Sequence, residues 1–445
     1  MSEPNNQDMS QSMRRVALTS LAGTSIEWYD FFLYGTAAAV IFPKAFFPQD
    51  LPVMVVLIAS FSTFAVGFIA RPLGGIIFGH YGDRIGRKKT LVVALMMMGA
   101  ATTLIGLLPT YASIGIMAPL ILVLLRFVQG LAIGGQWGGA MLLVTESAPA
   151  NRRGWYGAYA QAGAPVGVIL ANLAFLGISY YISEEAFLDW GWRVPFIASV
   201  ILIGISMYVQ LKLEDTEAFK ALVEARDDTG EEAGPTIEKS PVLQAIRMYP
   251  RRIILAAGAF LSVQVTFYIL IAFVIAYGVN SPTVNLSRDI MLMAVLVAAA
   301  VMIPTQFYFS GLSDRLGRKK VYQWGAVLTG LWGFALFPLI DTGNTYYIIL
   351  AVSMGLVFLG MQYGPQAAFF TELFSTEVRY SGASLGYQMG AILGGALAPT
   401  IAVLLWNQFD IFYVSLYIAA AAVLTLISLA MLTETSGVDL SNIEE

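Results

Sequence analysis

The stretch Asp83-Arg84-Ile85-Gly86-Arg87-Lys88-Lys89 occurs again as Asp314-Arg315-Leu316-Gly317-Arg318-Lys319-Lys320, 231 positions later, with six of seven residues identical. A second motif repeats at a similar spacing of 226 positions, as Glu146 with Arg153 and then as Glu372 with Arg379. Two motifs that repeat at nearly the same spacing indicate a chain built from two related halves. Each copy of the longer motif lies between two apolar blocks, which predicts a charged loop between helices.

Working outward from these loops, the rest of the chain is dominated by apolar blocks. Hydrophobic residues make up 57% of the 445 residues and charged residues only 12%, and the mean hydropathy is +0.70. A helix that crosses a bilayer needs about 20 mainly apolar residues, and about twelve blocks meet that length. The sequence therefore predicts an all-α integral membrane protein with twelve spans, at 18–42, 54–79, 91–109, 116–145, 155–181, 190–211, 253–279, 290–310, 321–340, 345–370, 380–405 and 411–432.

The positive charges predict the orientation of these spans. With the N-terminus in the cytoplasm, 20 of the 25 Lys and Arg residues fall in cytoplasmic segments, and only Lys44, Arg193 and Arg288 fall in outer loops. Such an excess is typical of cytoplasmic loops, so both termini are expected in the cytoplasm.

Polar segments set the expected organisation of the chain. Glu214 to Ser240 is the longest polar stretch and is expected to be a cytoplasmic linker between the halves. Residues 1–13 lack an apolar core and are expected to be a tail rather than a cleaved signal. The chain has no cysteine, which excludes disulfides. The predicted parts are an N-terminal tail (1–17), a first six-helix half (18–213), the linker (214–250), a second half (251–433) and a C-terminal tail (434–445).

Several motifs give the sequence a family resemblance. Residues 23–31 (GTSIEWYDF), 70–75 (ARPLGG), 126–130 (RFVQG) and 377–383 (EVRYSGA), with the repeated charged loop, are similar to the metabolite:proton symporter family of the major facilitator superfamily. That family includes shikimate, 2-oxoglutarate, citrate and proline/betaine permeases, and the sequence resembles the shikimate-like members most. The resemblance implies the major facilitator fold, with two pseudo-symmetric six-helix halves, in the cell inner membrane. One departure is Gln136, which stands where the family usually has an acidic residue.

Four ionisable residues lie well inside predicted spans, where they are costly and therefore functional candidates. They are Glu27 and Asp30 in the first span, Arg71 in the second and Arg126 in the fourth. At about 1.5 Å per residue, Asp30 and Arg126 fall near mid-depth, and Glu27 matches Arg71 in depth. Because a carboxyl group in a low dielectric protonates more easily than in water, Asp30 or Glu27 is expected to carry a coupling proton.

The two arginines are expected to bind the substrate or to pair with the two carboxylates. Arg126 would bind a substrate carboxylate or pair with Asp30 when the site is empty, and Arg71 would hold Glu27. The alternative is two ion pairs that only stabilise packing. The one histidine, His80, is expected in a surface loop, so a histidine relay at mid-depth is excluded.

Polar and aromatic side chains in the spans are further candidates. The resemblance implies that spans 1, 4, 7 and 10 line a central cavity. Together with Tyr29, the substrate-binding candidates beside the two arginines are Tyr34, Gln129, Gln136, Trp137, Gln264, Tyr268, Gln362, Tyr363, Gln366, Tyr387 and Gln388. Buried amides need partners, which a hydroxylated or carboxylated ligand would supply, and bonding between helices is the alternative. The glycines of spans 4 and 11 are interpreted as packing surfaces.

The charged loops are expected to latch the cytoplasmic side. The resemblance places Asp83 beside the start of span 11, near Tyr380, where an aspartate would favourably meet the positive end of a helix. The alternative is that the basic residues serve only to anchor the topology. The expected latch residues are Asp83, Arg84, Arg87, Glu146, Arg153, Asp314, Arg315, Arg318, Glu372 and Arg379.

These features together predict a secondary active transporter that takes up a small organic acid, such as shikimate, a dicarboxylate or an aromatic acid, with protons by alternating access. The alternatives are a symporter of a zwitterion such as proline or betaine, an uncoupled facilitator or antiporter, and a membrane receptor or structural subunit. No nucleophile, metal cluster, cofactor motif or Walker-type loop is visible, so an enzyme is not expected. The expected partners are the substrate, the proton and the bilayer, without nucleic acid or cofactor, and the expected state is a monomer.

Overall fold

The computed structural model describes residues 6–85, 87–134, 144–145, 148–214, 241–375 and 379–437, and these form helices without a strand. The long helices of the first half are α1 (Asn6–Val40), α3 (Val53–Ile85), α4 (Arg87–Leu107), α6 (Met117–Gly134), α8 (Arg153–Tyr181) and α10 (Arg193–Glu214). Its short elements are α2 (Phe42–Ala45), α5 (Tyr111–Ile114), η1 (Ala150–Arg152), α9 (Glu184–Ala186) and η2 (Phe187–Gly191).

The second half begins with the short helix α12 (Pro241–Met248). Two of its spans contain a π-helical turn. In the first, α13 (Pro250–Tyr268) continues through η4 (Ile269–Phe273) into α14 (Val274–Asn280). In the second, α18 (Arg379–Gly390) continues through η5 (Ala391–Ala396) to α19 (Ala398–Gln408). The remaining spans are α15 (Arg288–Leu316), α16 (Arg318–Asp341), α17 (Thr345–Glu372) and α20 (Ile411–Met431).

The helices agree with the predicted spans. Among the described residues, nine helices are long and apolar enough to cross a membrane, or ten if a bent pair counts as one span. The other two predicted blocks, 18–42 and 91–109, coincide with α1 and α4. Residues 6–17, assigned above to the tail, form the first turns of α1, where Met13 and Ala17 are buried against Tyr156 of α8.

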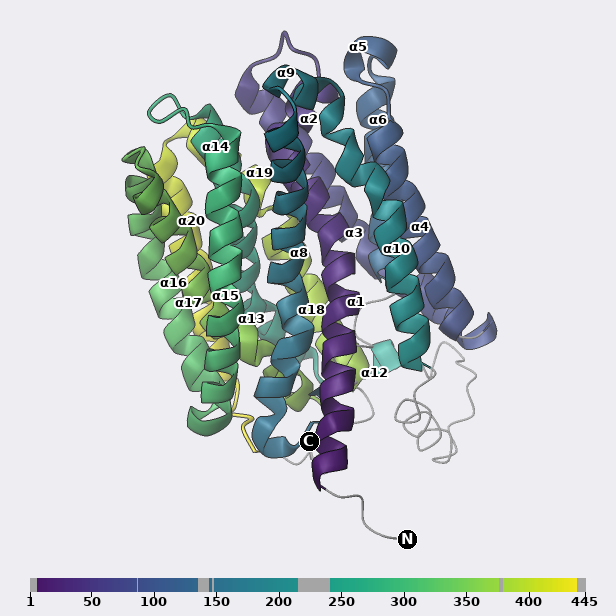
Figure 1. Ribbon diagram of the computed structural model, residues 1–445. Helices are drawn as coiled ribbons and strands as arrows, with labels where there is room; N and C mark the ends of the chain where they lie inside the picture. Colours follow the sequence, from purple (N-terminus) through teal and green to yellow (C-terminus); the bar gives the residue numbers. More distant parts are fainter. Residues whose placement is uncertain are drawn as a thin grey trace.

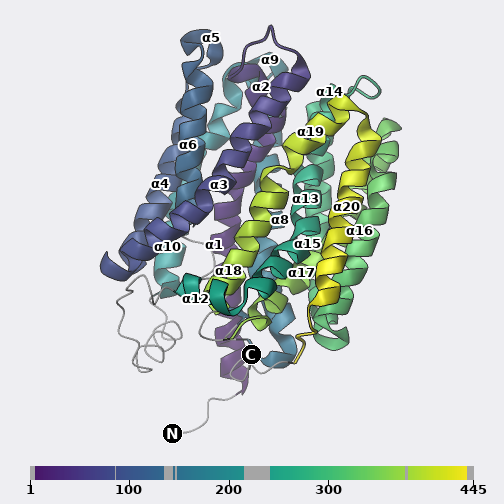
Figure 2. The same ribbon diagram turned by 180° about the vertical axis from the view of Figure 1, so that it is seen from behind.

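The two halves lie side by side, with the first half in purple to teal and the second in green to yellow (Figure 1). α1 begins and α20 ends at the same end of the bundle, here called the termini face (Figures 1 and 2). Between the halves, α8 packs against α15 and α17, α1 against η4 and α14, and α3 against η5 and α19. At the opposite end, Arg288 of α15 also bonds Glu184 of α9 at 2.8 Å.

Glycines allow α3 and α6 to cross without intervening side chains. A Cβ on Gly130 would overlap the carbonyl oxygen of Gly67, and one on Gly134 would overlap that of Arg71. Small residues at such spacing let membrane helices approach closely. The crossing therefore fixes the backbone of Arg71 on α3 close to the helix that carries Arg126.

Candidate functional site

Arg126 is fully buried in a cage of aromatic rings. Its guanidinium carbon lies 4.1 Å from the centre of the Tyr34 ring, 4.4 Å from that of Phe31 and 4.9 Å from that of Phe64. The faces of aromatic rings attract cations, and this attraction strengthens when water is excluded. The rings come from α1 and α3, so three helices hold one guanidinium.

Arg71 lies in an adjoining cage that shares the Phe31 ring. Its guanidinium carbon is 4.3 Å from the centre of Phe31, 4.5 Å from that of Phe68 and 5.7 Å from that of Trp28. Since both arginines lie over Phe31, their guanidinium carbons are at most 8.7 Å apart, the sum of the two ring distances. Two cations therefore share one apolar, aromatic environment.

In both guanidinium groups, the same two nitrogen atoms lack a hydrogen-bond partner. Nε and Nη2 of Arg71, and Nε and Nη2 of Arg126, are buried and form no hydrogen bond. Within the described part of the chain, no ion pair includes either residue. Nε and Nη2 form the side of a guanidinium that binds a carboxylate with two parallel hydrogen bonds. Because buried charge without a counterion is costly, this site is suited to an anionic ligand.

Asp30 is connected to Arg126 through two neutral side chains. Asp30 is 1% exposed, and its Oδ2 accepts a hydrogen bond from Thr102 Oγ1 at 3.3 Å, while Oδ1 has no partner. Thr102 Oγ1 accepts from Gln129 Nε2 at 2.7 Å, and Gln129 Oε1 accepts from Arg126 Nη1 at 3.1 Å. The structure thus brings Asp30, Gln129 and Arg126 together, but without the direct ion pair considered above. Thr102 was not predicted as a site residue.

The other first-half candidates surround this cluster. The Tyr34 hydroxyl donates to Thr63 at 2.7 Å, while its ring lies under Arg126. Tyr29 instead donates to the carbonyl of Pro195 on α10. Glu27 is half-buried, one turn before Asp30 on α1. Gln136 and Trp137 lie outside the described residues.

In the second half, Tyr268 is the candidate that reaches the two arginines. It interacts electrostatically with both, and its ring centre is 5.1 Å from that of Phe68. Gln362 instead turns towards α16 and donates to Thr329 at 2.8 Å. Gln366 and Gln388 each have a buried Oε1 without a partner, and Gln264 is buried. Tyr363 stacks on Phe267, and Tyr387 packs on Phe260.

At the termini face, four of the expected latch residues join the halves. Asp314 of α15 accepts hydrogen bonds from the backbone N–H groups of Gly154 at 2.9 Å and Trp155 at 3.0 Å, in the first turn of α8. Arg318 bonds Asp314, and Glu372 bonds both Arg318 at 3.2 Å and Arg153 at 3.1 Å.

The C-terminal residues extend this network, which the sequence did not predict. Thr435 donates to Glu372 at 2.7 Å, and Glu434 accepts from the backbone N–H of Arg318 at 2.8 Å. Arg315 is exposed. The side chains of Asp83, Arg84, Arg87, Glu146 and Arg379, and of His80 and Tyr380, lie outside the described part.

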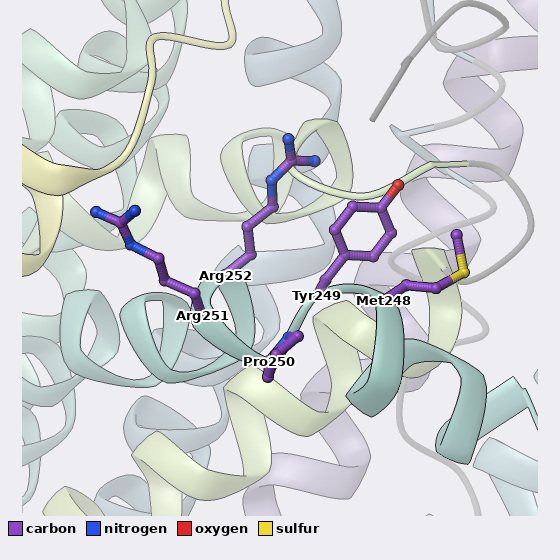
Figure 3. Close-up of a pocket in the computed structure, with 5 residues that line it drawn as sticks. All are labelled: Met248, Tyr249, Pro250, Arg251 and Arg252. Carbon is purple, nitrogen blue, oxygen red and sulfur yellow. The ribbon is translucent and has the colours of Figure 1, made fainter.

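A surface pocket lies away from the charged cluster. It is lined by Met248, Tyr249, Pro250, Arg251 and Arg252 at the start of α13 (Figure 3). Tyr268 is 18 residues further along the same helix, or about 27 Å at about 1.5 Å per residue. This pocket is therefore separate from the site around Asp30 and Arg126.

Comparisons with known proteins agree with the helical architecture. A family model described as Major Facilitator Superfamily matches residues 31–399 and 286–442. The chain is 41% identical to the inner membrane metabolite transport protein YhjE of Escherichia coli K12, over 95% of both chains. It is 38% identical to the shikimate transporter of the same organism, over 89% of this chain and 88% of the transporter.

Two further proteins are more distant. The chain is 32% identical to the proline/betaine transporter of Salmonella typhimurium, over 95% of this chain and 84% of the transporter. Among solved structures, the proton:xylose symporter XylE bound to 6-bromo-6-deoxy-D-glucose superposes with a TM-score of 0.73. That alignment covers 97% of this chain and 98% of XylE at 16% identity, so it bears on the fold alone.

Proposed function

Because the chain belongs to the major facilitator superfamily and is a multi-pass membrane transporter of metabolites, we propose that it takes up a small organic anion together with protons. The observation that carries this proposal is the connected pair of groups at the centre of the first half. Arg126 offers Nε and Nη2 to an anion, and the same guanidinium is linked to the buried carboxyl group of Asp30.

The residues have separate roles in this proposal. Arg126 and Arg71 bind the carboxylate of the ligand from the first half, and Tyr268 contributes from the second half. Asp30 takes the coupling proton, because a carboxyl group without a direct cationic partner is readily neutralised in a dry environment. Glu27, further along the same helix face, is the second candidate for the proton.

The ligand class is supported by the charge of the site. Two cations that form no ion pair with any described carboxylate favour an anion, and one relative is named a shikimate transporter. Other relatives are named proline/betaine transporters, which makes a zwitterion the second candidate. Aromatic cages do bind quaternary ammonium groups, but here the faces of Phe31, Phe64 and Phe68 are already covered by guanidinium groups. An organic anion is therefore favoured.

The network of Arg153, Asp314, Arg318 and Glu372 is proposed as the latch of the cytoplasmic side. It joins α8 of the first half to α15, α16 and α17 of the second. In this proposal the termini face is cytoplasmic, as the positive charges indicate. The latch opens and closes as the halves rock about the central site.

Uptake into proteoliposomes tests the proposal. Shikimate, dicarboxylates, aromatic acids, proline and betaine are offered with a neutral and with an acidic exterior. We expect accumulation of an acid that depends on the proton gradient, and its loss in Asp30→Asn with exchange of internal for external substrate retained. Full accumulation by Asp30→Asn would remove the proton role, and accumulation of a zwitterion alone would favour the second candidate.

A further inference from the structure

We propose that Thr102 and Gln129 are positioning residues that couple the protonation of Asp30 to the anion affinity of Arg126. This inference rests on the proposed function, and it adds the physical connection between its two sites. Neither residue is charged, and Gln129 does not contact Asp30. Their role follows from the order of the hydrogen bonds that they form.

The hydrogen bonds run in one direction from cation to carboxylate. Arg126 donates to Gln129, Gln129 donates to Thr102, and the Thr102 hydroxyl lies 3.3 Å from Asp30 Oδ2, one of the two acceptors within its reach. Bonds in such a series polarise one another, and the effect is larger in a low dielectric. An ionised Asp30 therefore strengthens the hold of Gln129 on Arg126. The amide of Gln129 does not release a proton, so the chain transmits orientation and polarisation rather than the proton itself.

Thr102 can change its hydrogen-bond acceptor. Its single hydroxyl hydrogen has two acceptors within reach, Asp30 Oδ2 at 3.3 Å and the carbonyl oxygen of Met98 at 2.9 Å. Neutralising Asp30 weakens the first bond, because a neutral acid is a poorer acceptor than a carboxylate. The hydroxyl then turns to Met98, Gln129 is less polarised, and Arg126 is freer to bind an anion. Proton and anion thus favour one another's binding, as linkage requires.

The second half contains a corresponding glutamine–threonine pair, without the charged residues that flank the pair in the first half. Gln362 Nε2 donates to Thr329 Oγ1 at 2.8 Å, close to the 2.7 Å between Gln129 and Thr102. Leu359, three residues before Gln362, occupies the position relative to that glutamine that Arg126 occupies relative to Gln129. The bond between the glutamine and the threonine is thus common to both halves as a packing contact. The first half adds a cation at one end and a carboxylate at the other.

The surroundings of Asp30 make its titration a usable readout. Apart from Thr102, it is faced by the hydroxyl of Ser199 on α10. Tyr29 interacts with it electrostatically, and Glu27 lies one turn before it on the same helix. Asp30 protonation can therefore be followed as the infrared C=O band of a carboxylic acid that is missing in Asp30→Asn.

Infrared titration of the full-length protein in liposomes, without any substrate, tests the coupling. We expect Thr102→Val and Gln129→Leu to move the protonation of Asp30 to higher pH by about one unit, a tenfold change in proton affinity. The direction follows because Thr102→Val removes the hydroxyl that can donate to the ionised form of Asp30, and Gln129→Leu removes the donor that polarises this hydroxyl. Thr329→Val and Gln362→Leu make the same changes in the uncharged pair and should leave the band at its wild-type pH. Thr102→Ser keeps the hydroxyl and should also titrate like wild type.

Two results would overturn the inference. One is an unchanged titration in Gln129→Leu, which would make that residue a packing element only. The other is an equal shift in Thr329→Val and Thr102→Val, which would indicate a general effect of lost packing. Because the readout needs no ligand, it is independent of whether the uptake panel contains the substrate, and failure of the uptake experiment alone would leave the coupling standing.

Discussion

At the scale of single residues, Gly67 makes room for the Arg126 guanidinium. A Cβ at this position would lie 2.6 Å from Arg126 Nε, one of the two atoms offered to an anion. We expect Gly67→Ala to retain the fold, because the far end of the arginine can move aside. It should lower the apparent affinity for the anion about tenfold, since a shifted guanidinium loses about one charge-assisted hydrogen bond. The measurement is the substrate concentration that gives half-maximal uptake.

Gly204→Ala is the matched control for this prediction. Gly204 is also a helical glycine, on α10, and a Cβ there would meet nothing within 4 Å. Its uptake should equal that of the wild type. Equal affinity in both variants would show that the Nε edge of Arg126 does not face the ligand.

The sequence indicated which charged residues would be buried inside spans, but not which side chains would surround them. Asp30, Arg71 and Arg126 could be predicted because ionisable residues are rare and costly inside spans. Their contacts could not, because Phe31, Phe64 and Phe68 look like ordinary apolar residues until α1, α3 and α6 are packed. Nothing in the sequence marked Thr102 as a site residue. A threonine in an apolar helix usually donates to its own backbone, as Thr102 also does.

At the scale of elements, Asp314 caps a helix of the other half. Its carboxylate accepts from the backbone N–H groups of Gly154 and Trp155 at the start of α8, where a negative charge is favoured. We expect Asp314→Asn to loosen the termini face, because the amide keeps one acceptor oxygen but loses the second acceptor and the negative charge, which costs about 1 kcal/mol, or about a fivefold change in an equilibrium. The readout is thiol labelling of Thr371→Cys, whose position is buried against Thr145 of the first half.

The labelling is specific because the natural chain has no cysteine. Asp410→Asn is the control, since Asp410 caps its own helix, α20, through the N–H of Phe412 and takes no part in the contact between halves. We expect faster labelling with Asp314→Asn and no change with Asp410→Asn. Equal labelling rates in all three backgrounds would remove Asp314 from the latch.

Helix positions were predicted well, but their ends and internal breaks were not. Over its described residues, each predicted apolar block coincides with a helix or a continuous helical unit, because the bilayer imposes a length on every span; residues 135–143 of the block 116–145 lie outside the described part. α1 begins at Asn6, twelve residues before its predicted block, since its first turns are polar and the prediction depended on apolar length. The π-helical turns η4 and η5 depend on how α13 and α18 pack, so no local pattern marks them.

At the scale of the molecule, the two halves contribute different groups to the candidate site and to the contacts between them. The repeated loop predicted two related halves, and the fold agrees. The structure adds that the described charged groups at mid-depth all lie in the first half, while the second contributes Tyr268 and most of the ion-pair network at the termini face. The halves meet at both ends, through Asp314 at the termini face and Arg288 at the other, so under the proposed alternating access we expect these contacts to break in turn.

Distances between spin labels test this alternation. One pair of exposed positions, Asn151→Cys with Lys320→Cys, spans the halves at the termini face, and a second pair, Ser113→Cys with Tyr346→Cys, spans them at the opposite end. If the halves rock as rigid bodies about the central site, acidification with substrate should change the two distances in opposite directions. Asp30→Asn should abolish the response to pH and retain the response to substrate. Two distances that stay fixed under every condition would instead support a receptor or structural subunit with the transporter fold.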